Sequence, residues 1–282
     1  MSQRNNQKNK QAARERMRAE RERQAKKDKV RRQLTVGGGV IAVLAIAAGI
    51  GIAVSNATSG SDNSKVSSAA WKKDAEKTTL AKPANTSGKD GTTVVIGDKD
   101  AKNTLHVYED MRCPVCSQFE QASGETVLKD IKDGTYNAQF TMGTFIDENK
   151  QLSGSGSKNA LSALGAALNV SPDAFLDYKK ALFSEKNHPA ETDDAFSDDQ
   201  KLIDIAQEVK ELKGNAKFES AVKKGTYDKW ALAMSKTFDS AKNVSGTPTF
   251  FLNDQKLVVN SQDQAPMTPD QFTPLVQKYL KK

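Results

Sequence analysis

The hydrophobic positions divide the chain into one long apolar run near its N-terminus and a series of short patterned segments beyond it. The run covers residues 34–54 and contains 21 residues without a charge. A membrane-spanning helix needs about 20 apolar residues, so this run predicts one transmembrane helix. A cleaved signal peptide is the alternative, because residues 53–57 (AVSNA) resemble a cleavage site.

From residue 92 onwards, alternating and helical patterns predict an α/β fold. Strand-like alternation is found at residues 92–97, 103–110, 137–147, 247–253 and 255–259. Helical periodicity is found from the cysteines to residue 133, over most of 155–242 and at 270–280. In chain order this gives a β-α-β unit, a helical block and a β-β-α unit, which predicts a sheet with helices on its faces.

Residues 55–91 connect the apolar run to the folded part, and they lack sustained apolar periodicity. They are rich in Ser, Ala, Lys, Asn and Gly, a composition typical of a flexible linker. Trp71 stands out in this segment, either as an anchor at the membrane interface or as an incidental residue. The predicted organisation is a tail (1–33), a membrane span (34–54), a linker (55–91) and a folded domain (92–282).

The formal net charge of +7 belongs to the tail. Residues 1–35 carry 13 Lys/Arg and 4 Asp/Glu, whereas the rest of the chain carries 29 and 31. Positive charge collects on the cytoplasmic side of a membrane span, which predicts a cytoplasmic N-terminus and an extracytoplasmic domain. The tail is interpreted as a topology determinant, with contact to anionic lipid as the alternative. Its alternating Arg and Glu, without an aromatic residue, argue against a nucleic-acid partner.

The only two cysteines of the chain, Cys113 and Cys116, lie three positions apart where a strand pattern gives way to a helix pattern. A disulfide that closes so short a loop stabilises a fold very little. Pro114 suits the first turn of a helix, and the helix N-terminus stabilises a thiolate at Cys113. Cys116 follows one turn later, within reach of a disulfide. We interpret Cys113 as an attacking sulfur and Cys116 as its resolving partner.

An inert cysteine pair and half of a zinc site are the alternatives to this interpretation. Zinc takes four ligands in structural sites, and the chain offers only His106 and His188 as histidine ligands. His106 lies in a strand pattern, and His188 lies in a separate turn. We therefore expect no metal and no other cofactor.

The segment VSGTPTFF, residues 244–251, is a second signal far from the cysteines in sequence. Gly246 and Pro248 mark the entry to an apolar strand, and Pro248 is a candidate for a cis peptide bond. The alternative is an ordinary proline at the start of an edge strand.

Taken together, residues 92–282 resemble the thioredoxin superfamily, and specifically its DsbA-like branch. This family has a CxxC motif at a helix N-terminus, a helical domain inserted into the thioredoxin fold and a cis-proline loop that faces the cysteines. The resemblance implies that residues 155–242 form the inserted domain. It also implies that the redox motif consists of Cys113, Pro114, Val115 and Cys116.

The resemblance implies a thiol-disulfide oxidoreductase, which the predicted span would tether to the cell membrane. The expected activity is donation of disulfides to exported proteins with free thiols, followed by reoxidation by a membrane partner. Thr247 and Pro248 would hold the main chain of the substrate as an added strand. The alternatives are an outward-facing reductase or isomerase, and a redox-inactive binding or chaperone-like module.

The sequence departs from the strongly oxidising members of the family at two positions. Val115 replaces the histidine between the cysteines, which implies a weaker oxidant. Val107 replaces the carboxylate that often lies buried six residues before the first cysteine. Glu109 or Asp110 could take its role, but as residues at a strand end both are expected to be solvated. Arg112 either supplies positive charge near the thiolate or lies at the surface.

Overall fold

The computed structural model describes residues 67–281. The predicted membrane span at 34–54, the basic tail before it and residues 55–66 lie outside the described residues. Within residues 67–281, every helix is too short or too polar to cross a membrane.

Five strands form one mixed sheet in the order β1-β3-β2-β4-β5. Their bounds are β1 (Val94–Ile96), β2 (Thr104–Asp110), β3 (Asn137–Gly143), β4 (Thr249–Leu252) and β5 (Gln255–Lys256). Strands β2 and β3 run parallel, whereas the β1–β3, β2–β4 and β4–β5 pairs are antiparallel. Parallel neighbours need a crossover connection, and the helix after β2 provides it. The sheet and its helices agree with the α/β fold predicted from the sequence.

Strand β2 lies between β3 and β4 and has one fully buried face. Leu105, Val107 and Glu109 are buried, and they alternate with the half-buried His106 and Tyr108. Residues two positions apart in a strand share a face. The carboxyl group of Glu109 therefore continues an apolar row into the interior.

Helices α3 (Pro114–Lys132) and α10 (Pro269–Tyr279) are among those that pack on this buried face of the sheet. Phe250 of β4 pairs with Val107 of β2 and so shares its face. The Phe250 ring lies 4.3 Å from the ring of Phe119 in α3 and 5.8 Å from that of Phe272 in α10, measured between centroids. These three rings join α3 and α10 to the sheet.

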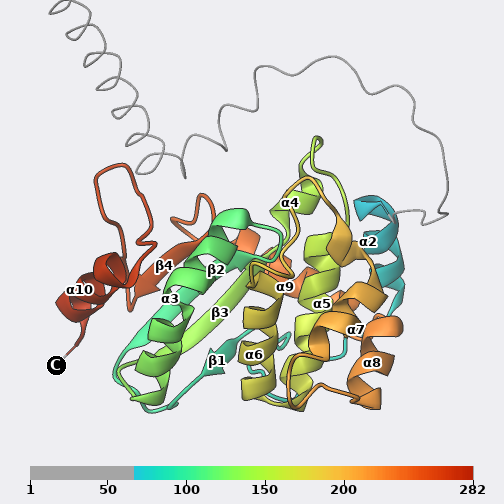
Figure 1. The fold of residues 1–282 in the computed structure, drawn as a ribbon, viewed down its shortest axis with the longest axis horizontal. Coiled ribbons are helices and arrows are strands. Elements are labelled where there is room, and N and C mark those ends of the chain that lie inside the picture. Colours follow the sequence, from blue (N-terminus) through green and yellow to red (C-terminus); the bar gives the residue numbers. More distant parts are fainter. Residues whose placement is uncertain (1–66, 282) are drawn as a thin grey trace, which may run out of the picture. The chain divides into compact units, whose positions relative to one another are not determined.

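The chain between β3 and β4 is mainly helical. Its elements are α4 (Phe145–Glu148), α5 (Gly156–Val170), α6 (Pro172–Phe183), the short 3-10 helix η2 (Ala195–Ser197), α7 (Asp199–Ala206), α8 (Ala216–Lys223) and α9 (Asp228–Asp239). Of the 15 residues of α5, 13 are buried, which is the pattern of a helix surrounded by other elements. Figure 1 shows α5, α6, α7 and α8 gathered at one side of the sheet, while α10 lies at the other.

Two predicted strands are shorter in the structure than in the sequence pattern. The strand predicted at 137–147 ends at Gly143, and Phe145–Glu148 forms α4 instead. The reason is that the Ile146 amide donates to the Asp110 carboxyl at 3.2 Å, which turns the chain away from the sheet. The strand predicted at 255–259 is reduced to β5, because Val259 donates its amide to Gln264 within its own loop.

The flexible linker predicted at 55–91 is wrong for residues 67–91. Residues 68–77 form helix α2 (Ser68–Lys77), and the hydroxyl of Ser67 caps it by accepting from the Ala70 amide at 3.2 Å. Trp71 and Ala75, one turn apart, are both buried in the core. Only these two residues of the helix are buried, and alanine is a weak hydrophobic signal in so polar a segment.

Helix α2 and the segment after it are attached to the inserted helices by hydrogen bonds. Lys229 of α9 donates to the carbonyl groups of Glu76 at 3.2 Å and Thr78 at 2.9 Å. The Trp230 indole donates to the Gly91 carbonyl at 2.7 Å. The packed fold therefore includes residues 68–91, which lie before the predicted domain boundary at residue 92.

Candidate active site

Cys113 and Cys116 lie where β2 turns into α3. The amide of Cys113 donates to the carbonyl of Asp110, the last residue of β2, at 3.0 Å, and this closes a tight turn. Cys113 is the N-cap of α3 and keeps an extended backbone, with φ −73° and ψ 116°. Pro114 follows as the first helical residue, where its missing amide costs no hydrogen bond. The Ser117 amide then donates to the Cys113 carbonyl at 3.1 Å and begins the helical pattern.

Both cysteines are free thiols in the structure, and their pKa values are shifted in opposite directions. A hydrogen bond with the Cys116 thiol lowers the pKa of Cys113, although burial acts in the opposite direction. Burial raises the pKa of Cys116 well above its usual range, and the neighbouring Cys113 raises it further. Cys113 is 6% exposed and Cys116 fully buried. A lower pKa and greater access make Cys113 the nucleophile of the pair.

The loop before β4 lies against Cys113. The peptide bond between Thr247 and Pro248 is cis, and the Cys113 thiol donates to the Thr247 carbonyl at an Sγ–O distance of 3.6 Å. This loop is carried to the cysteines because Thr249 of β4 pairs with Tyr108 of β2. Among the described residues, the buried hydroxyl of Thr247 has no hydrogen-bond partner.

The structure thus brings together the predicted site residues from two distant parts of the sequence. Cys113 and Cys116 meet the Thr247–Pro248 loop, and the two residues between the cysteines, Pro114 and Val115, are half-buried. Val115 packs against the hydrophobic core. Its side chain therefore provides no charge to the thiols.

Glu109 lies on the Cys116 side of the strand, fully buried. Lys179 of α6 donates to its Oε2 at 3.1 Å and to Glu120 Oε2 of α3 at 2.6 Å. Burial raises the pKa of Glu109 to about 7, although the Lys179 ammonium acts in the opposite direction. The Glu109 charge in turn raises the pKa of Cys116. A carboxyl group that exchanges its proton near neutral pH therefore lies beside the resolving thiol.

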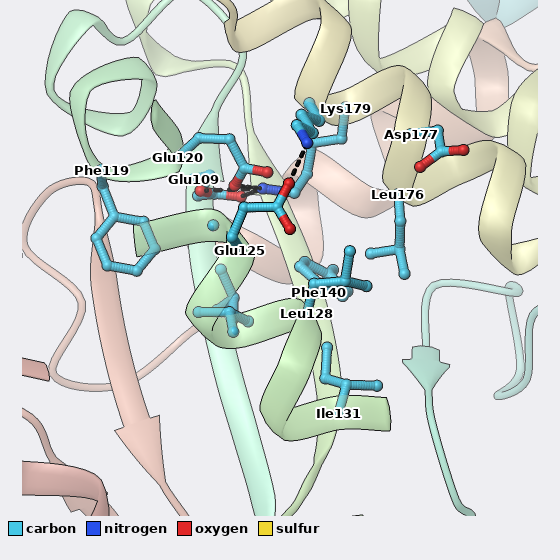
Figure 2. A pocket seen from close by; sticks show the side chains of 14 residues that line it. Glu109, Phe119, Glu120, Glu125, Leu128, Ile131, Phe140, Leu176, Asp177 and Lys179 are labelled. Atoms are coloured by element: carbon cyan, nitrogen blue, oxygen red, sulfur yellow. Dashed lines mark hydrogen bonds and ion pairs between the residues drawn. The ribbon is translucent and has the colours of Figure 1, made fainter. Parts of the chain in front are cut away.

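A small cavity of about 30 Å³ adjoins Glu109 between α3, α6 and the sheet. In Figure 2 the charged side chains gather at one end of this cavity, and the apolar side chains of Leu128, Phe140 and Ile131 line the other end. Roughly 10–15 Å³ of such volume accommodates one water molecule. The cavity is therefore large enough for a proton-carrying water next to Glu109.

Asp110, the next residue of β2, faces α4 and α5. Its carboxyl group accepts from the Ser157 hydroxyl at 2.6 Å, the Arg112 amide at 3.0 Å and the Ile146 amide at 3.2 Å. Burial raises the pKa of Asp110 to about 7. The charge of Asp110 raises the pKa of Cys113, against the effect of the hydrogen bonds to that thiol.

These positions correct two expectations from the sequence. Glu109 and Asp110 were expected to be solvated at the end of a strand, but both are fully buried because inserted helices cover that end. Arg112 is also buried, and its guanidinium pairs with Asp147 at 2.8 Å and Asp194 at 3.2 Å. Arg112 therefore joins the redox turn to the inserted helices and is neither a surface residue nor a cation committed to the thiolate.

Sequence reasoning missed Lys179 and Ser157, which complete the surroundings of the two carboxyl groups. A signal for Lys179 exists in the helical pattern of α6, where it lies one turn after Phe175 and one turn before Phe183 on the buried side. A lysine on an apolar stripe needs a buried carboxylate partner. Ser157 carries no comparable signal, because serine is common at the start of a helix.

The two histidines stay apart from the thiols. His188 Nε2 donates to the Met111 carbonyl at 3.2 Å, and burial lowers the pKa of His188 to about 4. His106 lies in β2 opposite Phe251, and burial lowers its pKa as well. Among residues 67–281, no three His, Cys, Asp or Glu side chains are grouped in a way that could hold a metal ion.

Comparisons with known proteins agree with this arrangement. The sequence model of the thioredoxin family matches residues 89–278. Disulfide bond formation protein D of Bacillus subtilis is 27% identical over 192 residues, which cover 66% of this chain and 77% of that protein.

Solved structures extend the likeness to three dimensions. The oxidised DsbA of Mycobacterium tuberculosis superposes with a TM-score of 0.54 and 25% identity, over 67% of this chain and 93% of that one. The reduced disulfide bond oxidoreductase DsbG of Mycobacterium tuberculosis superposes with a TM-score of 0.53 and 26% identity, over 75% and 93%.

Proposed function

Because this chain belongs to the thioredoxin family, we propose that it is a thiol-disulfide oxidoreductase of the DsbA type whose redox pair is Cys113 and Cys116. One observation carries the proposal: two thiols lie one turn apart at a helix N-terminus, one 6% exposed and the other fully buried, and burial raises the pKa of the buried thiol. The thiol with the lowered pKa also contacts the cis-proline loop. An inert cysteine pair has no need of such an asymmetry.

The proposed reaction begins with the Cys113–Cys116 disulfide. A substrate thiolate attacks Cys113 Sγ, the disulfide breaks, and Cys116 leaves as a thiolate that takes up a proton. A second thiolate of the substrate then attacks the substrate sulfur of the mixed disulfide, and Cys113 leaves as a thiolate. Two electrons pass from the substrate to the enzyme, and the substrate keeps a new disulfide. The lowered pKa of Cys113 favours its departure from the mixed disulfide, because thiols of lower pKa leave faster.

Glu109 supplies the proton that Cys116 needs when it leaves. The raised pKa of Cys116 makes its thiolate unstable in the interior. Glu109 is protonated below about pH 7 and acts electrostatically on Cys116, so it is the buried acid to which we assign this proton. Lys179 then stabilises the Glu109 carboxylate that remains.

Substrate binding is assigned to the loop that contains Thr247 and Pro248. This loop touches Cys113 and leads directly into β4. A substrate segment lying along it would form main-chain hydrogen bonds, as in the addition of a strand to a sheet. Main-chain hydrogen bonds do not depend on the side chains of the substrate, which suits an enzyme that acts on many proteins.

The direction and location of the reaction extend this proposal. We place the catalytic domain outside the cytoplasm, tethered to the cell membrane by the apolar run at 34–54, with the basic tail in the cytoplasm. There it donates disulfides to exported proteins with free thiols, and a membrane partner reoxidises it. Reduction or isomerisation with the same cysteines is the alternative direction.

Exchange with a reduced, unfolded protein tests the proposal. The oxidised full chain should form disulfides in the reduced substrate, and Cys113→Ser should abolish the activity. Cys116→Ser, first loaded with glutathione as a mixed disulfide on Cys113 and then given a substrate with a single thiol, should release glutathione and keep a mixed disulfide between Cys113 and the substrate, visible by mass. Unchanged exchange by Cys113→Ser would contradict the proposed role of Cys113, whereas absence of exchange in the wild type, with substrate binding that survives Cys113→Ser, would favour a redox-inactive binding module.

The reduction potential of the cysteine pair decides the direction. The full chain is equilibrated in glutathione buffers, and its thiols are trapped with a mass-shifting alkylator. Reference values are about −270 mV for thioredoxin and about −120 mV for DsbA. A value above about −180 mV supports the oxidase, whereas a value near −270 mV makes the chain a reductase.

A further inference from the structure

A groove of about 470 Å³ lies on the face of the sheet away from α3 and α10. It is lined by residues of the loop after α9 and of the hairpin formed by β4 and β5, among them Phe251. Phe250, which pairs with Val107, carries the contacts to α3 and α10, whereas Phe251 pairs with His106. Neighbouring residues of a strand point to opposite faces, so Phe251 places the groove on the other side of the sheet.

The groove begins directly before the cis-proline loop. Asn243, Val244 and Ser245 line it, and Thr247, whose carbonyl accepts from the Cys113 thiol at 3.6 Å, follows two residues after Ser245. Two residues of chain span at most about 7 Å. A substrate segment that binds along Thr247 can therefore continue into the groove.

Val244 and Phe251 give the groove an apolar part. Both residues are half-buried, and the ring of Tyr108 meets that of Phe251 edge-on at 5.9 Å between centroids. A side chain that is already held in place loses little conformational freedom when a ligand binds. This part suits the substrate side chains that follow the main-chain contacts at Thr247.

The charge of the groove comes from the hairpin. Three charged residues line it, Lys256, Asp263 and Asp254. Lys256 forms an ion pair with Asp263, so these two charges compensate each other, while Lys242, next to Asn243 in the chain, does not line the groove. Asp254 is exposed and has no ion-pair partner within residues 67–281. The uncompensated charge is negative and complements a basic side chain.

Asp254 lies one strand length from the cis-proline loop. Between Thr247 and Asp254 the chain runs through β4 (Thr249–Leu252) and enters the turn to β5. An extended substrate advances by about 3.3 Å per residue, as β4 itself does. From the cysteine that reacts with Cys113, a substrate therefore needs about five to seven residues to reach Asp254.

We propose that this groove binds the substrate segment next to the reacting cysteine and favours Lys or Arg about five to seven positions from that cysteine. The inference rests on the proposed function, because the occupant is the polypeptide that exchanges its thiols with Cys113. Main-chain contacts at Thr247 accept any sequence. The groove is then the part of the substrate site that distinguishes one substrate from another.

Peptides with two neighbouring cysteines test this preference. They carry Lys or Glu six positions from the nearer cysteine, on its N-terminal or its C-terminal side, and are mixed with the oxidised full chain. Two electrons and two protons pass from each peptide to the Cys113–Cys116 disulfide, and mass spectrometry gives the rate. Each rate is divided by that of the same peptide with glutathione disulfide, which removes intrinsic differences between the thiols.

On one of the two sides, the Lys peptide should react about threefold faster than the Glu peptide, the size expected for an exposed ion pair. The difference should shrink at high salt. Asp254→Lys should reverse the preference, and Asp254→Asn should remove it. Asp177→Lys is the matched control and should keep the preference, because Asp177 is also exposed but belongs to α6, which packs against α3.

The outcomes separate this inference from the proposed function. Equal rates for the Lys and Glu peptides, or a preference that persists in Asp254→Asn, would overturn the role of the groove while exchange itself remains. Peptides with serine in place of both cysteines measure binding alone, by fluorescence anisotropy of a labelled peptide. Tighter binding of the Lys peptide that depends on Asp254, without any exchange, would support the groove and reject the proposed function.

Discussion

Glu109 and Asp110 are neighbours in β2, but their carboxyl groups lie in different surroundings. On the side of α3 and α6, Glu109 binds the Lys179 ammonium and lies near the resolving thiol Cys116. On the side of α4 and α5, Asp110 binds only neutral donors and lies near the attacking thiol Cys113. Both carboxyl groups have a pKa raised to about 7 by burial.

Burial raises the pKa of both carboxyl groups into the same range. The hydrogen-bond partner of each group then determines whether its carboxylate form is stabilised by a cation. The ionised form of Glu109 has a cation to bind, so this side can lose and regain a proton during the reaction. The ionised form of Asp110 binds no cation, and its negative charge raises the pKa of the Cys113 thiol. At the end of β2, Asp110 therefore acts on Cys113 and Glu109 acts on Cys116.

The largest expected effect comes from removing the cation on the Glu109 side. Lys179→Met keeps the length of the side chain but leaves two carboxyl groups without their partner. Removing one member of a buried ion pair costs about 3–5 kcal/mol. At pH 8 the free energy of unfolding, measured with urea, should therefore fall by about 3 kcal/mol. At pH 5 the loss should be smaller, because Glu109 is then protonated. An equal loss at both pH values would mean that Glu109 does not titrate between them.

Asp110→Asn should change how stability depends on pH. A carboxyl group whose pKa is raised on folding keeps its proton longer in the folded state, so its contribution to stability falls as pH rises towards the folded value, about 7. Between pH 5 and pH 8 this loss amounts to about 2–3 kcal/mol for the wild type. Asp110→Asn lacks the titrating group. Between pH 5 and pH 8 its free energy of unfolding should therefore rise relative to that of the wild type by the same amount. Parallel pH curves for the two proteins would show that Asp110 has an ordinary pKa.

Glu109→Gln should slow the step in which Cys116 leaves the disulfide. Without this acid the Cys116 thiolate forms in the interior unprotonated, and loss of such proton transfer costs about 100-fold or more in rate. The rate of mixed-disulfide formation, measured by stopped flow, should show the largest ratio of wild type to variant at pH 6. The ratio should fall above pH 7, because Glu109 has then lost its own proton. A ratio that is constant with pH would assign the effect to structure alone.

The sequence predicts the structural features around the two carboxyl groups that depend only on residues adjacent in the chain. The strand-to-helix junction at Cys113, with Pro114 in the first turn, follows from local preferences. The cap of α6 is similar, since the Ser171 hydroxyl accepts from the Ala174 amide at 2.9 Å as its position before Pro172 suggests. Such features require only a few consecutive residues.

Features that depend on distant contacts could not be read from the chain. Lys179 and Glu109 are 70 positions apart, and nothing in either segment specifies the pairing. The burial of Asp110 depends on α4 and α5 folding over the strand end, whereas a strand end by itself predicts exposure. Helix α2 escaped detection for the same reason, since it packs against α9, an inserted helix that is distant in the sequence.

The smallest effect should come from Lys180→Met, the substitution next to Lys179. Lys180 also has a carboxylate partner, Glu125, but the two side chains are 56% and 73% exposed, whereas the Lys179 side chain is only 4% exposed. An exposed ion pair gains little because water solvates both separated charges, so Lys180→Met should change the free energy of unfolding by less than about 0.5 kcal/mol. Urea unfolding at low and at high salt measures this, and the small difference should vanish at high salt. If Lys180→Met were as damaging as Lys179→Met, burial would not explain the sensitivity of the Glu109 side.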